Sequence, residues 1–347
     1  MKKDIDPYVT YGEIRRTQKK MEWELARGPE YWEYRRKWEE RSKKMDPGDF
    51  PIHLDIETTN ACNLRCPMCP RTIMALDKSG KVGFMDFELY KSIIDQGAEN
   101  GLCSVKLNYL GEPLIHPDII KQVKYAKEKG IIEVMFNTNA FLLTEEMSRK
   151  LLEAGLDSIF FSIDYASPEK YNRIRVGSDF HRVVNNIKKF IELKNKLGYR
   201  HVQTRISMVV MDHTKEELED YRKFGFEELG VDLVGYGELV DYSEERAWYP
   251  EFFNPNFVCA QLFHRMFIMW DGVVTPCCAD TKRESIMGDA KKEKLKDIWH
   301  NEKYRRMRDA HVSGKYYEIP ICRKCYIPVS SLKKRGGEHQ HTGHHSS

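Results

Sequence analysis

The sequence lacks a long apolar segment and an excess of charge of one sign. No hydrophobic run approaches the roughly 20 residues that a membrane helix needs, and the first residues have no apolar stretch of the kind that marks a secretion signal. Because 56 Lys and Arg are balanced by 53 Asp and Glu, no basic surface for nucleic acid is predicted either. We therefore expect a cytoplasmic protein with neither a membrane nor a nucleic-acid partner.

The 347-residue chain has nine cysteines, and most of them fall into tight groups. Disulfide frameworks belong to oxidising compartments and use their cysteines in pairs, whereas nine is an odd number. The cysteine pattern therefore favours metal or redox chemistry over a disulfide scaffold.

Changes in residue pattern divide the chain into four parts. Residues 1–50 are rich in charged and aromatic residues and predict a helical extension, either a cap packed on the next domain or an arm that binds a partner or gates the substrate. Residues 51–240 alternate short apolar strands with longer helices. Residues 255–330 form a small second module, and residues 331–347, rich in Gly, His and Ser, predict a disordered tail.

The alternation within residues 51–240 predicts an α/β domain. Six strands separated by helical crossovers form a parallel sheet, as an open doubly wound sheet or a partial β/α barrel. In both folds, functional residues gather at the carboxyl ends of the strands. The predicted strands are 52–59, 105–110, 133–139, 158–164, 202–210 and 232–239, and the predicted helices are 86–99, 118–130, 144–155, 168–175, 179–197 and 214–230.

Beyond residue 240 the alternation stops. The segment Arg265–Cys278 predicts a β-hairpin that turns at Asp271-Gly272, because Asp-Gly between apolar runs is a strong hairpin signal. The segment Leu295–His311 predicts one helix, and Cys322 and Cys325 are expected in a loop flanked by prolines.

Three cysteines, Cys62, Cys66 and Cys69, follow the first predicted strand with the spacing C-x3-C-x2-C. Three thiolates within eight residues can bind three irons of a cluster and leave the fourth iron open to another ligand. A structural zinc site needs a fourth Cys or His, and none follows at zinc-ribbon spacing. The spacing favours an open iron–sulfur site, with zinc or unrelated buried thiols as the alternatives.

At these residues the chain resembles the radical S-adenosylmethionine (SAM) enzymes, over about residues 50–330. The resemblance implies a partial (β/α)6 barrel whose cysteine loop holds a [4Fe–4S] cluster, with SAM bound to the open iron. It also implies that one-electron reduction cleaves SAM to a 5′-deoxyadenosyl radical, which abstracts a hydrogen atom from the substrate. One departure is Met68, which stands where the family usually has an aromatic residue.

Two further segments resemble the family's SAM-binding motifs. The segment Asn108–Pro113, NYLGEP, resembles the GGEP motif, in which Gly111 and Glu112 would receive the SAM amino group. Asn139, at the end of the third strand, stands at the family's ribose-binding position.

The end of the fourth strand adds more of this pattern. Ser162 and Asp164 resemble the family's SxDG segment, with Tyr165 where Gly is common. Arg173 and Arg175 follow and suit the SAM carboxylate or an anionic substrate. The resemblance makes Ser162, Asp164 and Arg175 expected SAM contacts. Tyr165 and Arg173 are candidate catalytic residues.

A second group comprises Cys259, Cys277, Cys322 and Cys325. Four thiolates can bind either zinc or a [4Fe–4S] cluster, and spacing alone does not separate the two. The order C, G-x4-C, C-x2-C resembles the Twitch module, a shortened SPASM domain with one auxiliary [4Fe–4S] cluster. The overall spacing resembles the Twitch-bearing dehydrogenase of 2-deoxystreptamine biosynthesis. The cofactors implied are therefore SAM and two [4Fe–4S] clusters.

Two cysteines lie outside both groups. Cys103 precedes the second predicted strand and is expected in the core. Cys278 adjoins Cys277 and would be a spare thiol, an alternative ligand, or a catalytic hydrogen donor to a substrate radical.

These features predict a radical SAM oxidoreductase that acts as a dehydrogenase or epimerase on a small polar substrate, such as an aminocyclitol, a sugar or a nucleotide sugar. A flavodoxin or ferredoxin would supply the electron. Modification of a ribosomal peptide or protein side chain is a second hypothesis, and a non-catalytic zinc protein is a third.

Overall fold

The computed structural model describes residues 12–17, 19–239, 254, 256–325 and 327. Its central sheet has ten strands in the order β1-β7-β6-β5-β4-β3-β2-β8-β9-β10. Strands β2 to β7 run parallel to one another, and consecutive strands among them are joined by helices. The predicted tail at 331–347 lies outside the described residues.

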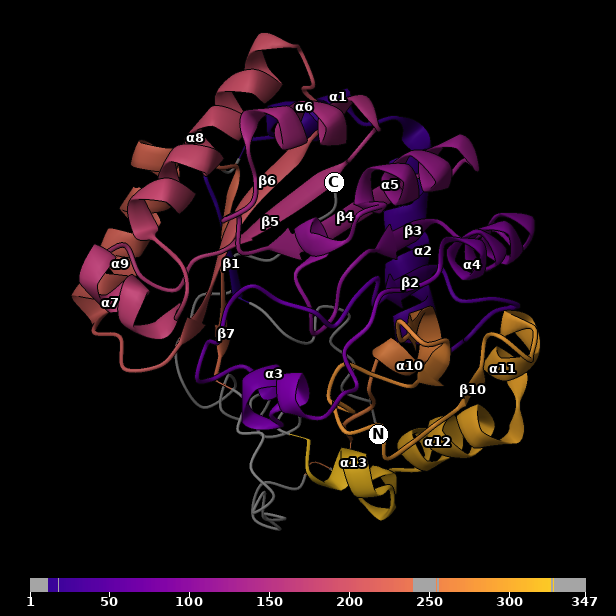
Figure 1. The fold of residues 1–347 in the computed structure, drawn as a ribbon. Helices are drawn as coiled ribbons and strands as arrows, with labels where there is room; N and C mark the ends of the chain where they lie inside the picture. Colours follow the sequence, from indigo (N-terminus) through magenta and orange to yellow (C-terminus); the bar gives the residue numbers. More distant parts are fainter. Residues whose placement is uncertain (1–11, 18, 240–253, 255, 326, 328–347) are drawn as a thin grey trace.

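This arrangement confirms the predicted partial (β/α)6 barrel. The strands are β2 (His53–Ile56), β3 (Ser104–Lys106), β4 (Glu133–Thr138), β5 (Ser158–Ser162), β6 (Gln203–Val210) and β7 (Leu233–Glu238). The helices, which Figure 1 shows on the outer side of the sheet, are α4 (Phe87–Glu99), α5 (Ile119–Glu128), α6 (Glu145–Glu153), α7 (Pro168–Ile174), α8 (Phe180–Lys196) and α9 (Lys215–Lys223). The last helix continues as a π-helical segment, Phe224–Leu229.

The two faces of each barrel strand have different neighbours. On β2, Leu54 and Ile56 are fully buried in the main core, together with Ile93 of α4 and Val123 of α5. Because side chains alternate along a strand, Asp55 points to the opposite face, into the barrel. The apolar core therefore lies between the sheet and its helices, and the inner face of the strands is left for polar residues.

Helix boundaries follow local sequence signals. The carboxylate of Asp86 accepts backbone hydrogen bonds at the start of α4, and Thr144 Oγ1 accepts one from the N–H of Met147 (3.2 Å) at the start of α6. Gly130 and Gly155 follow α5 and α6 with φ of +83° and +92°, a conformation that favours glycine.

The N-terminal residues pack as a cap on the amino ends of the strands. Helices α1 (Glu22–Ala26) and α2 (Pro29–Lys44) contribute to a second buried cluster, which also takes in Cys103, as predicted for that cysteine. Arg27 lies between the two helices, and its guanidinium pairs with the buried Glu133 of β4 (2.6 Å). The members of the cluster are Met21, Trp23, Tyr31, Tyr34, Trp38, Ile52, Cys103 and Leu233.

The prediction of a purely helical extension was wrong in one respect. Residues Gly12–Arg15 form strand β1, which pairs antiparallel with β7. A four-residue strand has too few residues to show an alternating pattern, and it forms here because β7 would otherwise leave its backbone groups unpaired.

The C-terminal module joins the same sheet through the predicted hairpin. Strands β8 (Arg265–Ile268) and β9 (Val273–Thr275) are antiparallel and turn at Gly272, whose φ is +89°. Strand β8 also pairs in parallel with β2, which extends the barrel sheet into the module. Figure 1 shows the remaining elements together at one end of the molecule: α10 (Gln261–His264), β10 (Gly288–Asp289), α11 (Leu295–His300), α12 (Glu302–Val312) and α13 (Pro320–Arg323).

Two local predictions for this module were wrong. The segment Leu295–His311 is two helices instead of one, because Asn301 has extended backbone and its side chain accepts a hydrogen bond from the N–H of Tyr304 (3.0 Å), which starts α12. Cys322 lies in the short helix α13 and not in a loop, since Pro320 occupies a first-turn position where its missing N–H costs nothing.

We predict that Arg27→Met destabilises the protein by about 3–5 kcal/mol, because it removes the ion-pair partner of the buried Glu133 carboxylate. Chemical denaturation of the anaerobic protein measures the loss. The control is Arg36→Met on α2, whose ion pairs with Glu33 and Glu40 are exposed and should cost less than about 1 kcal/mol. Equal losses in the two variants would contradict the prediction.

Candidate functional site

The loop that contains the first cysteine group follows β2 directly. Asn60 anchors it, because its side-chain oxygen accepts a hydrogen bond from the N–H of Gly83 (2.9 Å). From the short helix α3 (Pro70–Ile73), the buried Arg71 donates to the Asn60 carbonyl and pairs with Asp77. These contacts hold the loop on both sides of its three thiols, those of Cys62, Cys66 and Cys69.

The predicted Gly111-Glu112 motif lies against this loop. A Cβ at Gly111 would be 2.1 Å from the carbonyl oxygen of Thr59 and 2.7 Å from that of Ala61, so glycine alone allows the two segments to approach. The N–H of Glu112 donates to the Ala61 carbonyl (2.8 Å). The end of β3 is therefore joined directly to the cysteine loop.

The buried Glu112 carboxylate connects β3 with β4. It accepts hydrogen bonds from Thr138 Oγ1 (2.6 Å) and from the N–H of Asn139 (2.7 Å). Burial raises the pKa of Glu112 to about 7, and these hydrogen bonds oppose the rise. The Asn139 amide donates to Asn63 Oδ1 (2.9 Å) and lies 4.0 Å from Cys62 Sγ, which brings the third motif to the first cysteine.

Asp164 and Arg175 form a buried ion pair beside Cys66. Arg175 Nε donates to Asp164 Oδ2 at 2.6 Å. Burial raises the pKa of the Cys66 thiol, while the neighbouring Arg175 guanidinium lowers it. Ser162 ends β5 next to this pair, and its backbone is in register with Ser207 of β6. The fourth strand end thus also faces the cysteine loop.

The other two candidates, Tyr165 and Arg173, meet at Asp212. The Tyr165 hydroxyl donates to the Asp212 carboxylate, and its ring stacks on His213 with centroids 4.0 Å apart. Arg173 Nη2 lies 3.8 Å from Asp212, and the Arg173 side chain is 64% exposed. Burial and the Asp212 carboxylate raise the pKa of Tyr165, so its phenol keeps its proton. These residues form a separate polar group after β5.

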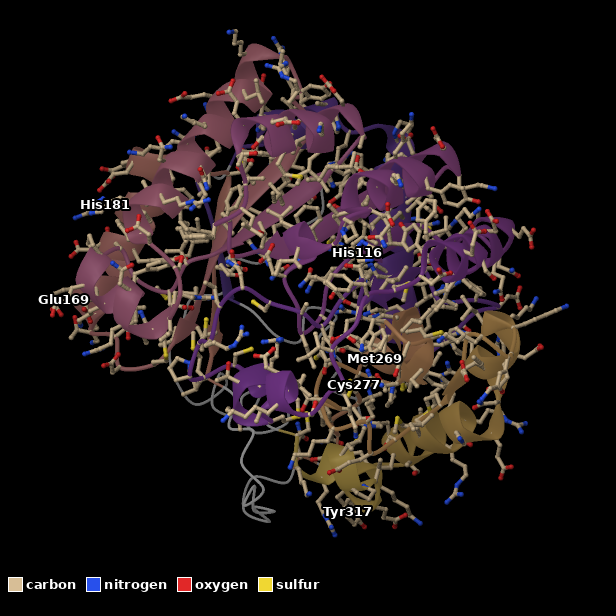
Figure 2. All side chains as sticks on the ribbon, in the orientation of Figure 1. His116, Glu169, His181, Met269, Cys277 and Tyr317 are labelled. Carbon is tan, nitrogen blue, oxygen red and sulfur yellow. The ribbon has the colours of Figure 1, made fainter. Side chains whose placement is uncertain are left out.

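The second cysteine group lines one cavity in the C-terminal module. All four cysteines of this group contribute to its wall: Cys259, Cys277, Cys322 and Cys325. Figure 2 shows Cys277 on the side of the barrel where the C-terminal elements gather. The rest of the wall is largely apolar and includes Phe257, Leu262, Met307, Ile321 and Ile327. Four thiols in an apolar enclosure suit a cluster that is shielded from water.

His311 completes this cavity and was not predicted. Its Nδ1 accepts a hydrogen bond from the N–H of Cys259 (3.3 Å), and its Nε2 lies 3.3 Å from Cys322 Sγ. Burial lowers the pKa of His311 to about 3, so the ring is neutral and its single proton sits on Nε2, facing the sulfur. This role could not be predicted from the sequence, because His311 lies within a helix and its spacing from the cysteines matches no known motif.

Cys278 borders both the cavity and the barrel. Its Sγ lies 3.9 Å from Gln261 Oε1, and its carbonyl accepts a hydrogen bond from the Tyr109 hydroxyl (2.7 Å). Burial raises the pKa of the Cys278 thiol, and Arg265 and Lys106 of the barrel lower it. The electrostatic coupling to barrel residues distinguishes Cys278 from its neighbour Cys277.

Glu57 is a second residue that sequence reasoning missed. It follows β2 and is 1% exposed, with Leu110 N and Trp270 N each 3.4 Å from a carboxylate oxygen. Burial raises the pKa of Glu57 to about 7, although Arg283 lies 3.8 Å away. The sequence signal that could have identified Glu57 was its carboxylate, two residues after Asp55 in a buried strand.

A comparison with protein-family models identifies the larger domain. The model described as the radical SAM superfamily matches residues 56–235, more than half of the chain. The chain belongs to the radical SAM superfamily. A second model, SPASM, described as an iron-sulfur cluster-binding domain, matches residues 259–326.

Two curated radical SAM relatives illustrate the range of similarity. The chain is 27% identical over 322 residues to the tungsten-containing aldehyde ferredoxin oxidoreductase cofactor-modifying protein of Pyrococcus furiosus, over 79% of this chain and 87% of that protein. It is 29% identical over 205 residues to GTP 3′,8-cyclase of Alkaliphilus metalliredigens, over 59% of this chain and 61% of that protein.

Solved radical SAM structures share the fold. BtrN in complex with AdoMet and 2-DOIA has a TM-score of 0.53 at 19% identity, covering 80% of this chain and 93% of BtrN. Streptococcus suis SuiB bound to S-adenosylmethionine has a TM-score of 0.58 at 16% identity, covering 89% and 81%. Native anSMEcpe with bound AdoMet has a TM-score of 0.58 at 18% identity, covering 75% and 83%.

The cofactors of this radical SAM protein are SAM and two [4Fe–4S] clusters, and the residues present fit them. The first cysteine loop offers three thiols beside the ends of β3, β4 and β5, and the lack of a side chain at Gly111 lets the end of β3 meet the loop. The second cavity offers four thiols. Burial raises the pKa of Cys62 and of Cys259 to about 12, and a cluster's iron is the positive charge that deprotonates such thiols.

Among the described residues, no helix is long and apolar enough to cross a membrane.

We predict that Glu57→Gln changes how stability depends on pH. Because the pKa of Glu57 is raised from its ordinary value to about 7 on folding, its carboxyl favours the folded state at low pH, and this contribution is lost as pH rises through 7. Between pH 5.5 and 8 the wild type should therefore lose about 2 kcal/mol relative to Glu57→Gln in urea unfolding. The exposed Glu99→Gln should follow the wild type. Parallel curves for wild type and Glu57→Gln would contradict the pKa.

Proposed function

We propose that the protein is a radical SAM oxidoreductase that removes a hydrogen atom from a small polar molecule, such as an aminocyclitol, a sugar or a nucleotide sugar. One observation carries the proposal: the ends of three strands, β3, β4 and β5, bring SAM-motif residues to the cysteine loop that follows β2, above a barrel interior with charged side chains. A second cysteine-lined cavity borders that interior at Cys278.

The names of the relatives support a small molecule over a peptide as substrate. The Pyrococcus furiosus protein is named for modifying a cofactor, and the cyclases are named for GTP. SuiB has been solved with its precursor peptide SuiA, but its likeness to this chain, at 17% identity, is one of fold.

In this proposal the strand-end residues hold the first cofactors. Cys62, Cys66 and Cys69 would ligate one cluster and leave an iron for SAM. The Glu112 carboxylate still has acceptor capacity beyond its two short hydrogen bonds, and a ligand ammonium would keep it ionised at neutral pH. The remaining SAM contacts would come from Gly111, Asn139, Ser162, Asp164 and Arg175.

The second cavity would hold the auxiliary cluster through Cys259, Cys277, Cys322 and Cys325. When bound, SAM and the two clusters supply hydrogen-atom abstraction and a place for the electron left behind. Conversion of a carbinol to a ketone would then balance: one hydrogen atom would leave the carbon, the hydroxyl proton would go to a base, and an auxiliary cluster held by these cysteines would supply the acceptor for the remaining electron. His311 would donate a hydrogen bond to the ligand sulfur of Cys322 and so help to set how readily that electron is accepted.

The polar group after β5 would bind the substrate. Tyr165 retains its proton and donates it to Asp212, so it would hold Asp212 in place rather than act as the base. Arg173 is exposed and would attract an anionic or hydroxyl-rich ligand. A flavodoxin or ferredoxin would deliver the electron that starts the reaction.

Epimerisation is the second candidate function, favoured by the position of Cys278. A thiol that borders the barrel could return a hydrogen atom to a substrate carbon, which inverts the centre without net oxidation. The Cys278 thiyl radical left behind would take one electron, from the flavodoxin or ferredoxin donor, and one proton to restore the thiol, so no electron would pass from the substrate to the second cavity.

Two iron–sulfur sites predict a clear metal count. The anaerobically purified protein should contain about eight irons per chain, and both Cys62→Ala and Cys322→Ala should retain about four, because each breaks one of two independent sites. Iron, sulfide and zinc analysis measures this. The buried Cys103→Ala is the control and should keep all the iron. Iron near four with a zinc change in Cys322→Ala would make the second module structural, and no iron would contradict the proposed function.

Cys278→Ala separates dehydrogenation from epimerisation. We expect this variant to keep both clusters and to form ketone and 5′-deoxyadenosine at a rate within about tenfold of wild type if the reaction is a dehydrogenation, since no hydrogen returns to the substrate. The measurement is product analysis in D2O with a panel of aminocyclitols, sugars and nucleotide sugars. Deuterium in a wild-type epimer, lost in Cys278→Ala, would assign epimerisation instead.

A further inference from the structure

A belt of charged side chains crosses the inner face of the barrel on β2, β3, β6 and β8. Asp55 of β2 and Lys106 of β3 are register partners on neighbouring parallel strands. Arg265 of β8 donates to Asp55 through Nη2 (2.7 Å) and Nε (2.9 Å). Arg205 of β6 lies across the barrel, with its guanidinium 3.9 Å from the Phe160 ring.

Water reaches the inner face of the barrel at the belt. Lys106, Arg205 and Arg265 are each half-buried although they stand in the middle of the sheet, whereas the alternate residues Val105 and Met266 are fully buried. The inner face is therefore open to a ligand where the outer face is sealed by the helices.

The charges of the belt do not balance. Asp55 is committed to Arg265 in a two-pronged ion pair, which leaves Lys106 as an additional cation, and within the described residues Lys106 has no ion pair or hydrogen-bond partner for its ammonium. Burial, together with repulsion from Arg265 and Arg205, lowers the pKa of Lys106, while Asp55 raises it. A half-buried cation beside other cations is stabilised when an anion approaches it.

We propose that Lys106 and the adjoining Arg265 bind an anionic group of the substrate, a phosphate ester or a carboxylate, inside the barrel. This inference rests on the proposed function and narrows its substrate class from polar to anionic. The site lies beside Cys278 and hence beside the second cavity, so the anion would hold the substrate near that cavity. Ammonium and guanidinium groups suit both phosphate and carboxylate oxygens.

Thermal unfolding of the reconstituted holoprotein with SAM tests the proposal, with sodium phosphate and sodium acetate compared against sodium chloride at equal ionic strength. Phosphate, acetate or both should raise the wild-type Tm by ~2 °C or more, because an anion that binds only the folded state stabilises it. The larger effect identifies the phosphate or the carboxylate arm. Lys106→Met should lose the shift.

A second measurement tests whether Lys106 has only a structural role. Without added anion, Lys106→Met should have a Tm at least equal to that of wild type, because it removes a repelled cation from the barrel. The control is Lys124→Met, an exposed lysine of α5 that pairs with Glu128; it changes the net charge equally and should keep the phosphate or acetate shift. No excess shift over chloride in wild type, or the same shift in Lys106→Met, would overturn the proposal.

The proposed function is tested separately in the same samples. Formation of 5′-deoxyadenosine on chemical reduction without substrate reports SAM cleavage and does not depend on the anion. SAM cleavage without an anion effect would overturn only the anionic substrate class. An anion effect without iron or SAM cleavage would overturn only the proposed function.

Discussion

The meeting of the strand ends at Glu112 is the constraint on which the rest of the site depends. Its carboxylate receives hydrogen bonds from β4, and the Gly111 backbone beside it touches the loop after β2. Parallel strands in register bring their carboxyl ends to one edge, but only a residue without a side chain lets the segments close to contact. The positions of the cysteine loop and of Asn139 relative to each other follow from that closure.

The barrel separates stability from chemistry by the two faces of its strands. Apolar residues of β2 and the other strands pack outward against the helices, where burial stabilises the fold. The inner face holds ionised groups. Those with a structural role are paired with an opposite charge, whereas positive charge is in excess where a ligand can enter. Arg27 with Glu133 closes the amino end as a matched pair, whereas Lys106 stands at mid-barrel beside the pair of Asp55 and Arg265.

Much of this could be predicted from the sequence, because the signals are local. The C-x3-C-x2-C spacing, the Asp271-Gly272 turn and the alternation of strands and helices each lie within a few consecutive residues. The parallel pairing of β8 with β2 could not be predicted, since it joins residues more than 200 positions apart. The same holds for His311 and Lys106: each owes its significance to neighbours on other elements, and nothing in the adjoining sequence marks them.

The pairing of β1 with β7 and of β8 with β2 has a further consequence, for assembly. A six-strand parallel array has two open edges, and exposed edges recruit strands from other chains. Here the N-terminal segment covers one edge and the cluster-binding module covers the other. Separating the module from the barrel would uncover His53–Ile56, which are wholly buried in the intact protein. The module therefore protects the barrel from edge-to-edge association, in addition to carrying its own cysteine-lined cavity.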